Sequence, residues 1–176
     1  IPGIDLIFPD PGFILDKKDD LLGIVLTHAH EDHIGAVAHI WPNLKCKMYA
    51  TPFTAALITE KFKEKKIDIS PYLKIVPLNS KIKLGAFEID FVTLTHSILE
   101  PNGLSITTPL GTILHTGDWK IDPNPLIGGK IDEKKLKDIG DKGVSAMICD
   151  STNIFSPGRA GSCLLYTSPS PRDGLL

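Results

Sequence analysis

The chain of 176 residues contains little of several features that define common protein classes. Its three cysteines, Cys46, Cys149 and Cys163, lie far apart and form no CxxC pair. They therefore favour neither a disulfide framework nor a cysteine-based zinc site. The sequence has no apolar run of membrane-spanning length and no charged-then-apolar signal segment at its start. We expect a cytoplasmic protein that has no membrane partner.

An excess of positive charge is also missing. The 19 basic and 21 acidic residues give a formal net charge of -2, which is not the overall basic character of a nucleic-acid-binding domain. This does not exclude RNA, because a site that cuts phosphodiesters needs only local positive charge, which metal ions supply. We interpret Lys63, Lys65 and Lys66, within EKFKEKK, as a solvated helix face rather than a binding patch.

The hydrophobic pattern predicts an α/β protein whose layered sheet is partly antiparallel. Helical spacing predicts helices after Asp32, over 52–66 and over 131–143. Apolar or alternating runs predict strands over 23–27, 45–51, 72–79, 81–95 (with a turn at Gly85), 103–117 (a hairpin) and 144–150. The first and last of these strands are expected to be buried. Phe87, Ile89 and Phe91 are expected to form the buried face of a half-exposed strand.

Histidine is scarce as well, yet three of the six histidines lie within the stretch THAHEDHIG. This stretch joins a predicted strand to a predicted helix, which is the corner where ligands bind in open α/β sheets. Desolvating three imidazoles and a carboxylate side by side would be costly without a metal ion. The cluster of His28, His30, Asp32 and His33 therefore predicts a metal site.

Four predicted strands run into a histidine or an aspartate. These residues are His28, His96, Asp118 and Asp150. Strand ends on one side of a sheet converge in space although they are far apart in sequence, so we expect the four to lie at one sheet edge. Thr27 and Thr116, next to two of them, are interpreted as packing or ligand-supporting residues.

Imidazole and carboxylate are the usual ligands of zinc, and two ions about 3.5–4 Å apart stabilise the attacking and leaving oxygens of an in-line displacement. The two-residue step from His28 to His30 lets both imidazoles face one ion, which His96 completes. Asp32 and His33, which follow in the sequence, face a second ion. Asp118 has two oxygens with which to bridge both ions. The predicted ligands are His28, His30, Asp32, His33, His96 and Asp118.

Several polar residues have simpler interpretations. His39 lies on the helix past the cluster and His115 lies inside a strand, so both are interpreted as structural. The alternative role of Asp118 is that of a turn residue. Ser151 and Thr152 either donate hydrogen bonds to a phosphate or cap the following turn, and capping is favoured.

These motifs carry a resemblance to a known family. THAHEDHIG is similar to the HxHxDH signature of the metallo-β-lactamase superfamily. Together with HSILEPNGLSI around His96, HTGDWKIDP around Asp118 and DSTN at 150–153, it resembles ribonuclease J of the β-CASP branch. The resemblance implies a partial αββα sandwich with a mixed sheet flanked by helices. It implies the same six metal ligands, and catalytic roles for Asp32, Asp118 and Asp150, the last beginning the β-CASP motif series.

The activity implied by the resemblance is zinc-dependent hydrolysis of RNA, with manganese as the alternative metal. The action would be 5′-to-3′ exonucleolytic and endonucleolytic, in RNA decay and rRNA processing. Asp32 would orient the attacking hydroxide as well as bind metal. RNA is the implied partner, the parent protein is expected to be a homo-oligomer, and no small-molecule cofactor is expected.

The resemblance runs from about Ile4 to Ser162. We expect residues 1–162 to be a domain fragment that is inactive alone, with the first strands missing and the β-CASP domain absent. The final segment 163–176, CLLYTSPSPRDGLL, resembles the translation of a sequencing-library adapter. It is expected to be a non-native, disordered tail.

Two other functions remain open on sequence alone. A hydrolase of small thioesters or lactones would use the same ligands, and a metal-free binding or scaffold protein would keep the same fold. The DSTN segment favours a nuclease over the first alternative. The presence of all six ligands argues against the second alternative. A metal assay would separate the metal-dependent enzyme from the metal-free protein.

Overall fold

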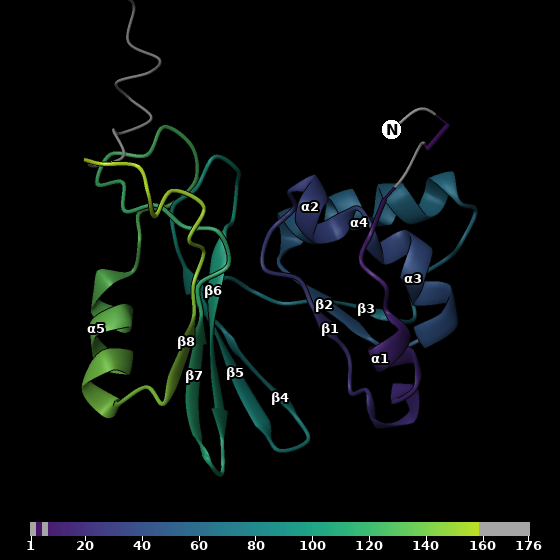
Figure 1. Ribbon diagram of the computed structural model, residues 1–176, viewed down its shortest axis with the longest axis horizontal. Coiled ribbons are helices and arrows are strands. Elements are labelled where there is room, and N and C mark those ends of the chain that lie inside the picture. Colours follow the sequence, from purple (N-terminus) through teal and green to yellow (C-terminus); the bar gives the residue numbers. More distant parts are fainter. Residues whose placement is uncertain (1–2, 5–6, 159–176) are drawn as a thin grey trace, which may run out of the picture. The chain divides into compact units, whose positions relative to one another are not determined.

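A computed structural model describes residues 3–4 and 7–158 (Figure 1). The chain divides into two compact units, Ile1–Ile75 and Val76–Leu176, and each unit has a sheet of its own. None of the described helices is both long and apolar enough to cross a membrane. The predicted tail at 163–176 lies outside the described residues, and the predicted domain limits remain predictions.

The first unit is a parallel three-stranded sheet with helical connections. Its elements are α1 (Gly12–Leu15), a 3₁₀ turn (Lys18–Asp20), β1 (Ile24–Val25), α2 (Glu31–Ile34), α3 (Val37–Leu44), β2 (Met48–Ala50), α4 (Pro52–Glu64) and β3 (Leu73–Ile75). The strands are hydrogen-bonded in the order β1-β2-β3. Parallel pairs require crossover connections, which α2–α3 and α4 provide. The predicted strands and helices of this region are confirmed, although the first predicted helix is divided into α2 and α3.

Aromatic packing fixes the helices of the first unit against its sheet. The Trp41 ring lies 5.5 Å from the Phe62 ring and 5.0 Å from the Tyr72 ring, edge to face in both cases. The Trp41 indole N–H donates to the Cys46 carbonyl at 2.7 Å, so its polar atom is satisfied inside the core. Met48 on β2 and Phe62 on α4 are fully buried. Strand β2 and helices α3 and α4 therefore share one core.

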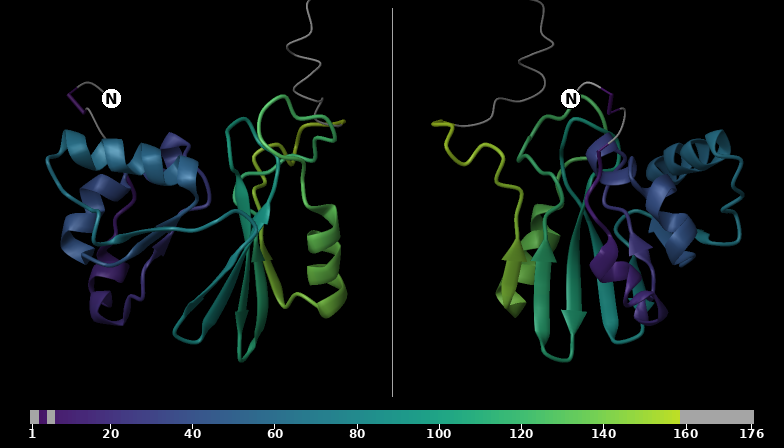
Figure 2. Two further views of the ribbon diagram at one scale, coloured as in Figure 1. Left: turned by 180° about the vertical axis from the view of Figure 1, so that it is seen from behind. Right: turned by 45° about the vertical axis from the view of Figure 1, so that its right-hand side comes forward.

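The second unit is a five-stranded sheet built mainly from hairpins. Its elements are β4 (Lys81–Leu84), β5 (Phe87–Thr93), β6 (Asn102–Thr108), β7 (Gly111–His115), α5 (Glu133–Lys142) and β8 (Ala146–Ile148). Neighbouring strands are antiparallel from β4 to β7, and β8 is parallel to β7 because α5 provides a crossover. In Figure 2 both hairpin turns lie at one end of this sheet, and the loops after β5 and β7 lie at the other.

Helix α5 is capped by a side chain and packs against strand β5. The Asp132 carboxylate accepts a hydrogen bond of 2.9 Å from the Lys135 backbone N–H, which satisfies a free donor of the first turn. Ile139 joins Val92 and Leu94 in a buried cluster, with Trp119 packed against it. The α/β class, with parallel and mixed sheets flanked by helices, is confirmed.

The expectation that all four functional strand ends share one sheet is wrong. Strand β1, which precedes His28, belongs to the parallel sheet, whereas β5, β7 and β8 belong to the other. The predicted strand over 72–79 ends at Ile75 because Pro77 has no N–H for a ladder, and the Ser80 N–H bonds back to the Pro77 carbonyl at 3.3 Å. This turn separates the two ladders.

Two burial predictions also need correction. Strand β8 was expected to be buried, but Ala146, Met147 and Ile148 are all exposed. It is the outer strand of its sheet and is hydrogen-bonded, among the described strands, to β7 alone. Phe87, expected in the core, is exposed because it begins β5 beside the hairpin turn, whereas Ile89 and Phe91 are buried as predicted.

Candidate metal centre

The histidine cluster lies at the carboxyl end of β1, where the chain turns into α2. His28 is fully buried, and its ring centroid lies 4.1 Å from that of His33 and 4.9 Å from that of His30. Thr27 Oγ1 lies 3.1 Å from His28 Nδ1 and orients that ring. Asp32 is mostly exposed, and its Oδ2 lies 3.6 Å from His33 Nε2. The structure thus brings together all the predicted ligands of the first unit.

Helix α2, which carries part of this cluster, is held by its neighbours. The helix has four residues, and His30 is its N-cap without a side-chain capping bond. The Glu31 carboxylate is paired with Lys61 of α4 at 2.5 Å. A Cβ atom on Gly35 would lie 2.5 Å from the Glu31 carbonyl oxygen, so only glycine permits this close approach. The sequence showed Glu31 within the motif, but nothing in it pointed to Lys61.

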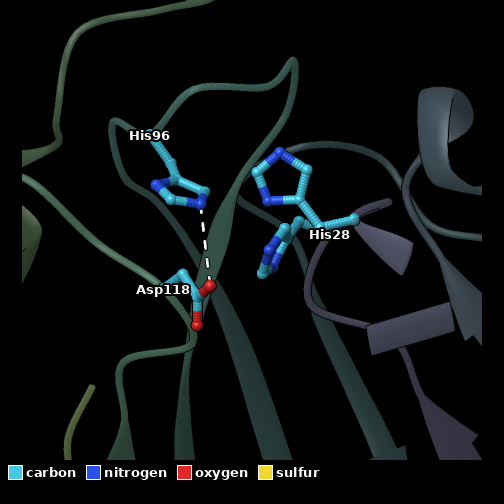
Figure 3. Close-up of side chains that lie close together, drawn as sticks. His28, His96 and Asp118 are labelled. Atoms are coloured by element: carbon cyan, nitrogen blue, oxygen red, sulfur yellow. Dashed lines mark ion pairs between the residues drawn. The ribbon is translucent and has the colours of Figure 1, made fainter. Parts of the chain in front are cut away.

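The second unit contributes a histidine and an aspartate. His96 follows β5 and Asp118 follows β7, and these strands run in the same direction because both are antiparallel to β6. His96 Nε2 and Asp118 Oδ2 lie 3.6 Å apart, as the dashed line in Figure 3 marks. Both side chains are partly buried. The predicted convergence of strand ends therefore holds within this sheet.

The turn that presents Asp118 is fixed by the residues before it. The buried Thr116 hydroxyl donates to the Gly117 carbonyl at 2.7 Å and accepts from the Asp150 N–H at 3.1 Å. Gly117 has a φ of 57°, which favours glycine, and its N–H donates to His115 Nδ1 at 3.0 Å. Thr116 and His115 therefore support the turn, in agreement with their predicted structural roles.

Asp150 follows β8 and organises the loops around it. Its Oδ1 accepts hydrogen bonds from the Thr152 N–H at 3.0 Å and the Thr152 hydroxyl at 2.7 Å. These bonds from Thr152, the backbone N–H of Trp119 and the charge of His96 together lower the pKa of the Asp150 carboxyl group. The carboxylate stays ionised and ties the Asp118–Trp119 loop to the end of β8. The Ser151 hydroxyl donates to the Cys149 carbonyl at 3.1 Å, so in the described contacts both hydroxyls bond back to earlier residues. The favoured capping interpretation is therefore wrong, because the Asp150 carboxylate accepts from the Thr152 N–H in their place.

One set of supporting contacts in the second unit was missed by the sequence. Thr95 and Lys120 form an isolated antiparallel bridge, and the Thr95 hydroxyl donates to the Lys120 carbonyl. The same hydroxyl accepts from the N–H of Asp122, a buried residue whose carboxylate lies 3.9 Å from the Lys120 ammonium. The bridge ties the residue before His96 to the segment after Asp118. An acidic residue followed by Pro123 was the only local signal.

Other candidates lie apart from these groups. His39 is exposed on α3, with Nδ1 3.3 Å from the Lys65 ammonium and its ring 5.8 Å from that of Phe8. Cys46 and Cys149 are free thiols, and burial raises the pKa of Cys46, so this thiol stays protonated. None of the three belongs to the predicted ligand set.

The donor chemistry of both groups fits zinc. Each offers imidazole nitrogens and carboxylate oxygens, which bind zinc at catalytic sites. A fully buried imidazole in contact with two others is a costly arrangement for an apolar core but an ordinary one for metal-binding histidines. The convergence of all six predicted ligands joins the two units and remains a prediction.

Comparison with known proteins defines the class. A family model described as "Beta-lactamase superfamily domain" matches residues 2–136, and the chain therefore belongs to the beta-lactamase superfamily. A solved structure titled as a protein of unknown function from Enterococcus faecalis V583 aligns with 80% of this chain and 34% of its own, with a TM-score of 0.51 and 20% identity. This likeness concerns the fold alone.

Closer relatives carry a more particular name. The chain is 43% identical over 160 residues to a protein of Sinorhizobium meliloti named Ribonuclease J, covering 90% of this chain and 28% of that protein. It is 44% identical over 165 residues to the Ribonuclease J of Corynebacterium glutamicum, covering 92% of this chain and 22% of that protein. The resemblance to ribonuclease J is thus confirmed, and the chain spans about a quarter of the length of these relatives.

Proposed function

We propose that this chain is the metal-binding part of a ribonuclease that hydrolyses RNA phosphodiester bonds with two zinc ions. The observation that carries the proposal is the placement of imidazole and carboxylate groups at strand ends in both units. The relatives named Ribonuclease J support RNA as the substrate. Since the chain covers a quarter of their length, the activity is proposed for the full-length parent.

The ligands are assigned by their positions. His28 and His30 of the first unit, with His96 of the second, would hold one ion. Asp32 and His33 would hold the other, and Asp118 would contribute an oxygen to each. When bound, the ions lower the pKa of a coordinated water toward neutrality and offset charge on the phosphate oxygens. Manganese is the alternative metal.

The chain's own residues would orient the metal ligands and the nucleophile, and would hold the Asp118 loop in place. The Thr27 hydroxyl holds the His28 ring through Nδ1. Asp32 is exposed at the start of α2, where its carboxylate would orient the nucleophile as well as bind metal. Asp150, proposed as a catalytic residue on resemblance, accepts hydrogen bonds from the Asp118 loop and from Thr152. Its contacts favour a role in holding the Asp118 loop in place.

The test is an RNA-decay assay on the full-length parent with a 5′-monophosphorylated substrate. A chelator should stop decay, and added zinc or manganese should restore it. A parent that degrades RNA at an unchanged rate after complete metal removal would refute the metal-dependent nuclease. Analysis of the products would separate exonucleolytic from endonucleolytic action, which the proposal includes on resemblance.

Two rival functions give different results in the same set of measurements. A small-molecule hydrolase would bind zinc and cleave a thioester or lactone but leave RNA intact. A metal-free scaffold protein would retain no zinc after dialysis. A cytoplasmic location and a homo-oligomeric parent remain predictions, which fractionation of cells and sedimentation of the parent would check.

A further inference from the structure

The acidic residue inside the histidine motif is held by a lysine from a separate helix. Lys61 Nζ on α4 lies 2.7 Å from Glu31 Oε1 and 2.5 Å from Glu31 Oε2. The ammonium therefore contacts both carboxylate oxygens of a residue 30 positions earlier in the chain. Neither side chain is among the proposed metal ligands. The pair is nevertheless adjacent to them, since Glu31 lies between His30 and Asp32.

The segment that contains Glu31 cannot hold its own shape. Helix α2 has four residues, a length at which an isolated helix is unstable in water. Its N-cap, His30, makes no side-chain capping bond. The segment is instead held from outside, by burial of Ile34 and by the Lys61 ammonium of α4. Of these contacts, the ion pair is the one made next to two proposed ligands.

We propose that Lys61 is a positioning residue for metal binding, which acts by holding Glu31 and thereby the turn that presents His30, Asp32 and His33. The proposal rests on the proposed metal site and adds a residue to it. The alternative is an ordinary surface ion pair, since Glu31 is 75% exposed and such pairs contribute little to stability. An ordinary surface pair would leave the metal affinity unaffected by its geometry.

The sign of one effect separates positioning from simple electrostatics. Removing the Lys61 cation leaves the Glu31 carboxylate unbalanced near the site, and this added negative potential alone would tighten the binding of a zinc cation. Loss of positioning weakens binding instead, because the ligands must then be ordered when the ion enters. A weaker affinity on removal of a neighbouring positive charge is therefore the signature of positioning.

The experiment measures the zinc affinity of the 176-residue chain by competition with a chromophoric chelator. Lys61→Met should weaken zinc binding about tenfold, the scale found when a residue that orients metal ligands is removed. Lys63→Met is the matched control: it removes the same charge from the same helix, where Lys63 pairs only with Glu60 at 2.6 Å in the described contacts. The zinc affinity of this control should stay within about twofold of that of the unsubstituted chain.

A charge exchange keeps the test sharp. The double variant Glu31→Lys with Lys61→Glu preserves the pair with its ends reversed and should recover most of the lost affinity. The absorption spectrum of bound cobalt should change in Lys61→Met and return in the double variant, which a role in global stability would not produce. The double variant also carries the test if Lys61→Met does not fold, and a tenfold loss in it would then overturn the proposal.

The outcomes distinguish this proposal from the one on which it rests. If the unsubstituted 176-residue chain binds zinc and Lys61→Met binds it as tightly as Lys63→Met, or more tightly, the positioning role is wrong while the metal site stands. If the unsubstituted chain binds no zinc, the metal site itself fails and the positioning role fails with it. A loss confined to Lys61→Met, with recovery on charge exchange, supports both.

Discussion

The two units place the proposed metal ligands at strand ends by different architectural means. In the first unit a parallel sheet with helical crossovers leads from β1 directly into a cluster of four proposed ligands within residues 28–33. In the second unit antiparallel hairpins bring His96 and Asp118 together from different strands. The first group depends mainly on the local path of the chain, and the second depends on sheet register. The units should therefore respond differently to substitution.

The largest effect is expected at Asp118, the carboxylate proposed to contribute an oxygen to both ions. In the full-length parent, Asp118→Ala should lower RNA hydrolysis by about 10³-fold or more, because it removes the ligand assigned to both ions. His39→Ala in the first unit should leave the rate nearly unchanged, because His39 lies on the exposed side of α3. The check is the RNA-decay rate with zinc present. Equal rates in the two variants would remove Asp118 from the site.

The cores of the two units can be compared through their tryptophans, because Trp41 lies in the first unit and Trp119 in the second. Phe62→Ala should lower the free energy of unfolding of the first unit by about 3–5 kcal/mol, since Phe62 is fully buried against Trp41. Leu94→Ala should lower that of the second by about 2–5 kcal/mol.

Denaturation followed by fluorescence, in variants that keep one tryptophan each, measures both effects. Phe62→Ala should shift the transition seen by Trp41 more than the transition seen by Trp119. Identical shifts at both tryptophans would mean that the units unfold together, and the division into two units would then have no energetic counterpart.

A smaller effect is expected at the hydroxyl that joins two strand ends of the second unit. Thr116→Val should cost about 1–3 kcal/mol, because the Asp150 N–H loses its buried acceptor. Thr112→Val is the matched control on β7, the strand that Thr116 follows, since its hydroxyl makes an exposed contact with that of Thr107. Thermal unfolding of both variants compares them. Equal melting temperatures would show that water replaces the Thr116 bond at little cost.

The smallest expected effect is a pH dependence confined to the second unit. The pKa of Asp150 is lowered from 3.8 in the folded chain, so its ionised form stabilises the fold above the unfolded pKa. That contribution should disappear as pH falls from about 4 through the lower folded value. Asp150→Asn should lose part of the acid sensitivity seen by Trp119 and none of that seen by Trp41. An unchanged acid transition at Trp119 would contradict the assignment.

The sequence predicted local features best. The cluster at His28–His33 was predicted because its members lie close together in sequence and follow an apolar run, and Pro52 marked the start of α4 correctly. Residues that act through contacts distant in sequence were missed, such as Lys61 on Glu31 and Asp122 on Thr95. Such pairs depend on the register of packed elements, which periodicity does not specify.

Burial and sheet membership were predicted less well. The apolar segment AMI of β8 has the composition of an interior strand, but its place at the sheet edge leaves it exposed. The composition of a segment shows that the segment is apolar, but it does not show which strands lie beside it in the sheet. Likewise, Pro77 is visible in the sequence, but only the strand pairing on either side shows that it lies between two separate sheets.

The most direct test of the shared metal site is a double-mutant cycle across the two units. His30→Ala and Asp118→Ala are compared singly and together for zinc affinity in the 176-residue chain. If both residues bind the same ion, the second substitution should cost much less once the first is made, with a coupling free energy of about 1–3 kcal/mol. Fully additive losses would contradict this, because they would show that the histidine of the first unit and the aspartate of the second bind zinc independently.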